Sequence, residues 1–298
     1  MGMTWKPEQD LKGRIALVAG GTRGAGRGIA EALGERGATV YVSGRTTREA
    51  RSELGRPETI EETAERVERA GGKAVAVRTD HMVPAQVEAL MERIGREQGR
   101  LDILVNDIWG GEKRSHWGKR YWESPLDDAL AMQRTVMETH YITAYLAAPL
   151  LALSDGALIA EITDGIDYRY RGELAYSLIK AWGIHMAAGL AEEWKAAGAA
   201  AVSLTPGFLR SEEMLDHFGV SEENWRDAAS QDPHFLESET PLFVGRALAC
   251  LAADPRRQEL SGRALSSWEL SDRYGFTDRD GRRPHWGAYF ATIENAVH

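Results

Sequence analysis

Short apolar runs alternate with longer amphipathic segments along the first 205 residues of this 298-residue chain. The runs are rich in Val, Ile, Leu and Ala and are apolar at consecutive positions, which is typical of parallel strands covered on both faces. Four of the amphipathic segments are followed by glycine, where helices commonly end. Strand and helix repeated in this order predict an α/β fold with a doubly wound parallel sheet.

The pattern predicts seven strands with helices on both faces of the sheet. The expected strands cover residues 14–19, 39–43, 74–78, 101–106, 157–162, 200–204 and 263–266. The expected helices cover residues 24–36, 58–70, 84–98, 125–153, 173–197 and 240–253. There is no internal repeat and no convincing linker, so we predict a single domain over 1–298 with its core at about 10–267.

Three segments stand outside this rhythm. Residues 107–124 and 207–238 are rich in aromatic residues and follow the C-terminal ends of expected strands, where ligands bind in such sheets. We therefore expect both to be substrate loops, and at least one tryptophan of 107–124 to line the substrate pocket. Residues 268–298 form a C-terminal extension, which could cover the pocket of its own chain or contact a neighbouring copy.

The composition of the chain bears on which binding partners, cellular location and metal sites can be expected. A net charge of −9 argues against nucleic acid as the main partner. A single cysteine, Cys250, excludes an internal disulfide and fits a reducing, cytoplasmic location. No apolar run reaches the roughly 18 residues of a membrane span, and the first residues lack the apolar core of a signal peptide. The histidines are scattered and no Cys-x-x-Cys motif is present, so no metal site is expected.

A glycine-rich turn joins the first expected strand to the first expected helix. Its sequence is Gly20-Gly21-Thr22-Arg23-Gly24-Ala25-Gly26. Glycines permit a tight turn and let backbone N–H groups approach a pyrophosphate at the positive end of the helix. The spacing is G-x-x-x-G-x-G rather than G-x-G-x-x-G. The turn predicts a dinucleotide site, with an ordinary strand-to-helix turn as the alternative.

The end of the second expected strand bears on which dinucleotide is bound. Sites for NAD place a carboxylate there for the ribose hydroxyls, whereas this chain has Ser43-Gly44-Arg45-Thr46. Arg45 and Arg23 could bind a 2′-phosphate, which the planar guanidinium suits. The alternative is that both are solvated surface residues. We therefore expect NADP(H) to be preferred, with NAD(H) as the alternative cofactor.

Tyr176 and Lys180 form a Y-x-x-x-K pair within an expected helix. Residues four apart lie on the same face of a helix. A lysine ammonium beside a phenol favours the phenolate, so the tyrosine can serve as an acid or base near neutral pH. Out of context, such a pair is as typical of an exposed helix surface.

The order and spacing of these motifs resemble the short-chain dehydrogenase/reductase family, whose fold is Rossmann-like. The residues that carry the resemblance over about 10–267 are Gly20, Gly24 and Gly26, then Asp80, Asn106, Tyr176 with Lys180, and Pro206-Gly207. The resemblance implies that Tyr176 exchanges the substrate proton, and that Lys180 binds the nicotinamide ribose and lowers the pKa of the tyrosine. It also implies that Asp80 meets the adenine and that Asn106 lines the cofactor cleft. Pro206, Gly207 and Ser211 would lie near the nicotinamide.

The chain departs from the family pattern at the catalytic serine, which lies about thirteen residues before the tyrosine. Thr163 stands there, and its hydroxyl can donate a hydrogen bond to a carbonyl oxygen. A shift of one residue would put Asp164 there instead, and a carboxylate beside a developing oxyanion is unfavourable unless it is protonated. We take Thr163 as the third catalytic residue, and we interpret Asp164 and Asp167 as solvated loop acids.

Two further departures concern asparagines. Asp107 replaces the second residue of the usual Asn-Asn-Ala-Gly motif. Residues 127–145 lack the asparagine that usually holds a relay water, and Val136 or His140 falls nearest to its position. Only His140 could relay protons, and we interpret it as a structural histidine.

These features together predict an NADP(H)-dependent oxidoreductase that interconverts a carbonyl and an alcohol of a small apolar or aromatic substrate. One alternative is a cofactor-binding sensor or scaffold without turnover, and another is a non-redox lyase-type enzyme on the same fold. Family members often pair through their fourth and fifth helices, so a homodimer or homotetramer is expected. No nucleic-acid or membrane partner is expected.

Overall fold

The computed structural model of the chain describes residue 8 and residues 10–297. Its centre is a seven-stranded sheet in the order β3-β2-β1-β4-β5-β6-β7, and all neighbouring strands are parallel. The strands are β1 (Ile15–Ala19), β2 (Thr39–Gly44), β3 (Lys73–Arg78), β4 (Ile103–Asn106), β5 (Leu158–Ile162), β6 (Ala200–Thr205) and β7 (Ala264–Ser266). The predicted doubly wound sheet is confirmed, and each expected strand overlaps an observed one.

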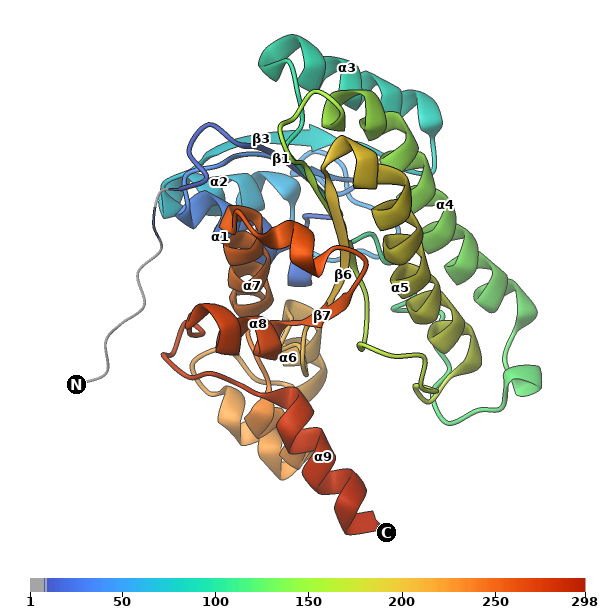
Figure 1. Cartoon of the computed structure of the whole chain (residues 1–298). Coiled ribbons are helices and arrows are strands. Elements are labelled where there is room, and N and C mark those ends of the chain that lie inside the picture. Colours follow the sequence, from blue (N-terminus) through green and yellow to red (C-terminus); the bar gives the residue numbers. More distant parts are fainter. Residues whose placement is uncertain (1–7, 9, 298) are drawn as a thin grey trace.

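Helices cover both faces of this sheet (Figure 1). One layer contains α1 (Gly24–Glu35), α2 (Ile60–Ala70) and α7 (Pro241–Ala253), and the other contains α3 (Pro84–Gln98), α4 (Leu126–Leu151) and α5 (Leu174–Trp194). Successive side chains of a strand point to opposite faces. Val18 accordingly packs in the cluster of Ile29 from α1, whereas Leu17 packs in the cluster of Leu90 from α3. Because both faces are buried, the strands are apolar at consecutive positions.

Glycines bring α1 and α7 into close contact. A Cβ on Gly245 of α7 would overlap the backbone carbonyl of Gly28 in α1, and a Cβ on Gly28 would overlap the carbonyl of Pro241. The two backbones therefore touch without side chains between them. This contact fixes α1, whose first residues belong to the glycine-rich turn.

Within the described residues, three α-helices occur where the sequence analysis expected only loops or an extension. They are α6 (Glu212–Phe218), α8 (Ser267–Tyr274) and α9 (Trp286–Val297). The side chain of Ser211 caps α6 and Gly219 ends it, but its seven residues are too short for a periodic pattern to be visible. Figure 1 shows α9 extending away from the sheet at the C-terminal end.

The order of the strands determines where a ligand can bind. From β1 the chain proceeds to β2 and β3 on one side, whereas β4 lies on the other side of β1. Parallel sheets bind ligands beyond the C-terminal ends of the strands at such a switch point. Among the described helices, none has the length and apolar character needed to cross a bilayer.

Candidate active site

A cavity of about 650 Å³ lies beyond the C-terminal ends of β1, β4, β5 and β6. Its volume is within the range of about 300–1,000 Å³ typical of ligand pockets. Most of the predicted site residues line it: Gly20, Thr22, Arg23, Gly24, Ala25, Arg45, Asp80, Thr163, Tyr176, Lys180, Pro206, Gly207 and Ser211. Segments far apart in the sequence therefore converge on one cavity.

Three predicted cofactor residues, Gly26, Ser43 and Asn106, lie behind the wall of this cavity. Ser43 is buried, and its Oγ lies 2.9 Å from Nε2 of the cavity-lining His81. Asn106 is also buried, and its Nδ2 donates to Oε1 of Glu161 at 2.7 Å. A Cβ on Gly26 would lie 2.5 Å from the carbonyl oxygen of Gly20. These positions support the lining residues rather than form the surface of the cavity.

The glycine-rich turn places the first residues of α1 at the wall of the cavity. Gly20 has a φ of 92°, a conformation that favours glycine. The Gly24 N–H at the start of α1 donates to Oε2 of Glu212 at 2.8 Å. The carboxylate of Glu212 therefore occupies the positive end of the helix, where a pyrophosphate would bind in a dinucleotide site. This end of α1 is chemically suited to the phosphate groups of such a cofactor.

Both arginines predicted to bind a 2′-phosphate are paired with acids. Arg23 Nη2 lies 2.6 Å from Oε1 of Glu112, and Arg45 Nη2 lies 2.8 Å from Oε1 of Glu53. The other oxygen of Glu112 is buried and has no hydrogen-bond partner among the described residues. An anionic ligand would compete with these carboxylates for the two guanidinium groups.

Tyr176 and Lys180 project from α5 into the same cavity. The rings of Trp109 and Trp117 meet Tyr176 edge-on, with centroids at 5.5 and 4.9 Å. Lys180 Nζ lies 4.3 Å from the centroid of the Trp109 ring, within the range of a cation–π contact. Trp109, a tryptophan of 107–124, lines the cavity, and its contact with the substrate stays a prediction.

The environment of Tyr176 differs from the expected one. Its hydroxyl donates to Oδ2 of Asp164 at 2.9 Å. Burial, followed by the charge and hydrogen bond of Asp164, raises the pKa of Tyr176 well above its usual value. The lowering of this pKa by Lys180 stays a prediction, and in this structure burial and Asp164 outweigh any such effect. Burial also lowers the pKa of Lys180, against the charges of Asp164 and Asp107.

The structure separates the roles available to Thr163 and Asp164. The Thr163 hydroxyl donates its one proton to the carbonyl oxygen of Lys180 at 2.8 Å, which ties the end of β5 to α5. The Asp164 side chain is 42% exposed, as expected of a solvated loop acid, but it also lines the cavity and contacts the Tyr176 hydroxyl, which the interpretation did not include. Asp167 does match that interpretation, because it pairs with Arg169 and Arg171 and does not line the cavity.

Of the residues at the two asparagine departures, His140 and Val136 are buried, whereas Asp107 is partly buried and lines the cavity. His140 Nδ1 lies 2.6 Å from Oε2 of Glu161, and its Nε2 lies 3.1 Å from the carbonyl oxygen of Ile108. His140 is not among the cavity-lining residues, which is the geometry of a structural histidine. Val136 packs against Met132. Burial raises the pKa of Asp107 to about 7, against the positive charge of Lys180, and its carboxylate accepts a hydrogen bond from Gly26.

Trp286, from the C-terminal extension, lines the cavity and was missed by the sequence analysis. It packs closely against Gly207, where a Cβ would lie 2.7 Å from that of Trp286. The extension therefore covers part of the cavity of its own chain. The aromatic content of this segment was a signal, but it could not show which surface the segment contacts.

Glu239 joins the Pro206-Gly207 segment to the start of α8. Its Oε2 accepts hydrogen bonds from the Gly207 N–H at 2.9 Å and from the Ser267 hydroxyl at 2.6 Å. Burial raises the pKa of Glu239 from 4.5 to about 8. The folded state therefore holds a proton that the unfolded state releases, and stability is lost as the pH rises from about 4.5 towards 8.

Replacing Glu239 by glutamine is expected to remove this pH dependence, because the amide keeps an acceptor oxygen and does not ionise. The free energy of unfolding of the wild type should fall between pH 5 and pH 9 by roughly 2–4 kcal/mol more than that of Glu239→Gln. Urea unfolding at a series of pH values measures both. The control is Glu237→Gln, because Glu237 is only partly buried. Parallel curves for wild type and Glu239→Gln would contradict the assignment.

A doubly wound sheet, a glycine-rich helix start and a Tyr–Lys pair that face one cavity define an α/β oxidoreductase of the dinucleotide-binding class. Residues 14–218 match the short chain dehydrogenase family. The chain belongs to this short-chain dehydrogenase/reductase family, whose members use NAD(H) or NADP(H). Among the described residues, no group of three or more His, Cys, Asp or Glu is arranged to hold a metal ion.

Relatives support this assignment along most of the chain. The chain is 33% identical over 277 residues to mouse dehydrogenase/reductase SDR family member 1, covering 91% of this chain and 85% of that protein. The human protein of the same name is 32% identical over 282 residues, with the same coverage. A short chain dehydrogenase from Mycobacterium thermoresistibile has a similar fold, with a TM-score of 0.76 at 23% identity over 93% of this chain and 92% of that one.

Proposed function

We propose that this protein is an NADP(H)-preferring oxidoreductase that interconverts a carbonyl and an alcohol of a small apolar or aromatic substrate. The observation that carries the proposal is the meeting of Tyr176, Lys180 and the glycine-rich turn in one cavity. The rings of Trp109 and Trp286 in the wall of this cavity suit an apolar or aromatic substrate.

The residues around the cavity fit a nicotinamide dinucleotide. The helix start at Gly24 already binds a carboxylate and would hold the pyrophosphate, while Arg23 and Arg45 would hold a 2′-phosphate. Asp80 would bind the adenine end, and Lys180 with Pro206, Gly207 and Ser211 would hold the nicotinamide end. When bound, such a cofactor supplies or accepts the hydride.

Residues of the chain would supply the proton that the carbonyl oxygen takes up. Tyr176 is a phenol whose pKa burial and Asp164 raise, and in reduction its hydroxyl would give its proton to the carbonyl oxygen of the substrate. The Lys180 ammonium near its ring would stabilise the phenolate that remains. Thr163 would position α5 through its hydrogen bond to the Lys180 carbonyl oxygen, rather than donate to the substrate.

Replacing Arg45 by alanine is expected to weaken NADPH binding by roughly 10- to 100-fold, because a charge-assisted contact to the 2′-phosphate is lost. Binding of NADH, which lacks this phosphate, should change little. Titration with each cofactor, followed by tryptophan fluorescence, measures both dissociation constants. The matched control is Arg48→Ala, because Arg48 pairs with Glu65 and does not line the cavity. Equal affinities of the wild type for NADPH and NADH would contradict the preference.

A second candidate function is a cofactor-binding sensor or scaffold without turnover. The contact between Asp164 and the Tyr176 hydroxyl favours it, because an occupied hydroxyl is less available to a substrate. NADPH binding without oxidation of NADPH by any member of a broad carbonyl panel would establish this alternative.

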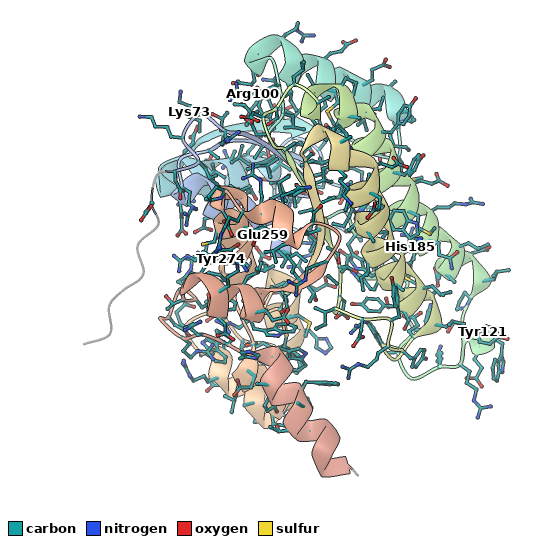
Figure 2. The ribbon with its side chains drawn as sticks, in the orientation of Figure 1. Lys73, Arg100, Tyr121, His185, Glu259 and Tyr274 are labelled. Carbon is teal, nitrogen blue, oxygen red and sulfur yellow. The ribbon has the colours of Figure 1, made fainter. Side chains whose placement is uncertain are left out.

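We also propose that the protein is cytoplasmic and forms a homodimer or homotetramer through α4 and α5. Large apolar side chains are exposed along the outer face of α4: Leu126, Leu130, Tyr141 and Tyr145, followed by Leu153 just beyond the helix. Tyr121 projects outward from the segment before α4 (Figure 2). Exposed apolar stripes of this kind commonly mark interfaces. Light scattering of the purified protein gives the mass in solution, and a monomer at micromolar concentration would contradict the proposal.

A further inference from the structure

Asp164 places a carboxylate at the point in the cavity where the proposed proton transfer occurs. Its Oδ2 accepts the Tyr176 hydroxyl at 2.9 Å, and its Oδ1 lies 3.5 Å from Nη1 of Arg171. Arg171 is held in turn by Asp167, whose Oδ1 lies 3.1 Å from Nη2 of the arginine. The cavity therefore presents a carboxylate, held by Arg171, beside the acidic hydroxyl.

An ionised carboxylate can accept hydrogen bonds but cannot donate them. A carbonyl oxygen also only accepts. When a plain ketone takes the Tyr176 proton donor, Asp164 loses its hydrogen bond and faces an oxygen that carries partial negative charge. The Asp164 side chain is 42% exposed and keeps its contact with Arg171, but two acceptor oxygens that face each other without a proton between them still repel. A substrate with a hydrogen-bond donor next to its carbonyl avoids this cost, because that donor can take the place of the tyrosine hydroxyl at Asp164.

We propose that Asp164 is a specificity-determining residue that binds a hydrogen-bond donor on the carbon next to the reacting carbonyl. The substrate class is accordingly α-hydroxy or α-amino carbonyl compounds, whose reduced forms are vicinal diols and amino alcohols. This inference rests on the proposed carbonyl reduction. In that reaction NADPH is oxidised to NADP⁺, its hydride adds to the carbonyl carbon, and the O–H bond of Tyr176 breaks as its proton moves to the carbonyl oxygen.

The surroundings of Asp164 leave it little freedom to turn away from the substrate. A Cβ on the next residue, Gly165, would overlap the guanidinium of Arg171, so the arginine packs directly on the backbone of this loop. Gly165 has a φ of 83°, and its N–H donates to the Thr205 hydroxyl oxygen at 2.8 Å. The rings of Trp109 and Trp117 flank Tyr176. The Asp164 side chain is 42% exposed, so a donor on the substrate would take the place of water as well as of the tyrosine hydroxyl at its Oδ2.

Four ketones of one aromatic series test the inference. They are α-hydroxyacetophenone, α-aminoacetophenone, α-methoxyacetophenone, which resembles the hydroxy compound but lacks the donor, and propiophenone. The wild type is expected to show a kcat/KM for a donor-bearing ketone roughly 10- to 100-fold above that for the methoxy compound. Asp164→Ser should remove this preference and raise kcat/KM for propiophenone, because serine can donate to a carbonyl oxygen. Asp164→Asn, a closer match in shape, should also reduce the preference.

The two donor-bearing ketones distinguish a hydroxyl from an ammonium group. If the wild type prefers the amino compound, and this preference disappears as the pH rises and the amine loses its proton, the donor is an ammonium group. Its positive charge then pairs with Asp164. If the wild type prefers the hydroxy compound, and this preference is unchanged over the same pH range, the donor is a hydroxyl group. Either result supports the inference and narrows the substrate class.

A binding measurement separates this inference from the proposed reaction. Phenylethane diol and its methoxy analogue can be titrated against the protein with NADP⁺ present, because Trp109 and Trp117 beside Tyr176 report binding by fluorescence. Tighter binding of the diol by the wild type, lost in Asp164→Ser, supports the Asp164 site even if no ketone is reduced. Reduction of all four ketones at similar rates, with equal binding of both ligands, overturns the inference and leaves the proposed reaction intact.

Asp167→Ser is the matched control. Asp167 also pairs with Arg171 and lies on the same loop, but it does not line the cavity. It should keep the preference of the wild type for donor-bearing ketones. If Asp167→Ser removes the preference as fully as Asp164→Ser does, the effect comes from a disturbed loop and the role of Asp164 is overturned.

Discussion

Replacing Tyr176 by phenylalanine is expected to lower the turnover of carbonyl substrates by roughly 10²–10⁴-fold, the usual contribution of a positioned acid. Phenylalanine keeps the ring that packs between Trp109 and Trp117 but removes the hydroxyl that faces the cavity. Because Lys180 and the glycine-rich turn are unchanged, the affinity for NADPH should stay within about threefold, a change of less than about 0.7 kcal/mol. The expected loss is therefore in kcat and not in cofactor binding.

Steady-state kinetics with NADPH, together with a fluorescence titration of the cofactor, measures both quantities. The matched control is Tyr168→Phe, because Tyr168 is 65% exposed on the loop before α5 and does not line the cavity. It should retain the turnover of the wild type. Retained turnover in Tyr176→Phe would mean that another group supplies the proton and would contradict the role of Tyr176.

The fold could be predicted from the sequence because strands of a sheet that is buried on both faces are apolar at consecutive positions. The run at β1 is apolar at every position, since Leu17 and Val18 pack against different helix layers. Helix ends were equally visible, as at Gly71, which ends α2 with a φ of 108°. The short helix α6 could not be predicted in this way, because its seven residues make about two turns and show no periodic pattern. Its capping residue, Ser211, cannot be told from a serine in a loop by sequence alone.

The cavity was predictable only in part, for a physical reason. Motifs locate residues whose place follows from the backbone, such as Gly24 at the start of a helix. Side-chain partners depend on how separate loops approach each other, so the pairing of Arg23 with Glu112 and the packing of Trp286 on Gly207 left no local signal. Asp164 was visible as an alternative to Thr163, but a sequence cannot show which side chain turns toward Tyr176.

Replacing Gly245 by alanine is expected to destabilise the protein by about 3 kcal/mol or more, the upper part of the range for overpacked sites. A methyl group on this residue would overlap the carbonyl of Gly28, which is backbone and cannot rotate away. Separation of α1 from α7 is the remaining way to make room. Urea unfolding of both proteins measures the difference in free energy of unfolding.

Gly189→Ala in α5 is the matched control, because nothing lies within 4 Å of a Cβ placed there. Alanine is the better helix former, so this variant should gain about 0.5–1 kcal/mol. Opposite signs for the same chemical change would show that the close contact of α1 with α7, rather than helix propensity, sets the cost at Gly245. Equal effects at the two positions would contradict the packing argument.

The contact between α1 and α7 also links stability to the site. Gly28 lies one turn beyond Gly24, which lines the cavity and whose N–H donates to Glu212. If α1 shifts to accommodate a methyl group on Gly245, the helix end that is proposed to hold the pyrophosphate shifts with it. Gly245→Ala should therefore bind NADPH more weakly under conditions in which it is still folded, although Gly245 does not line the cavity. Unchanged affinity in a destabilised but folded variant would show that α7, not α1, moves to relieve the overlap.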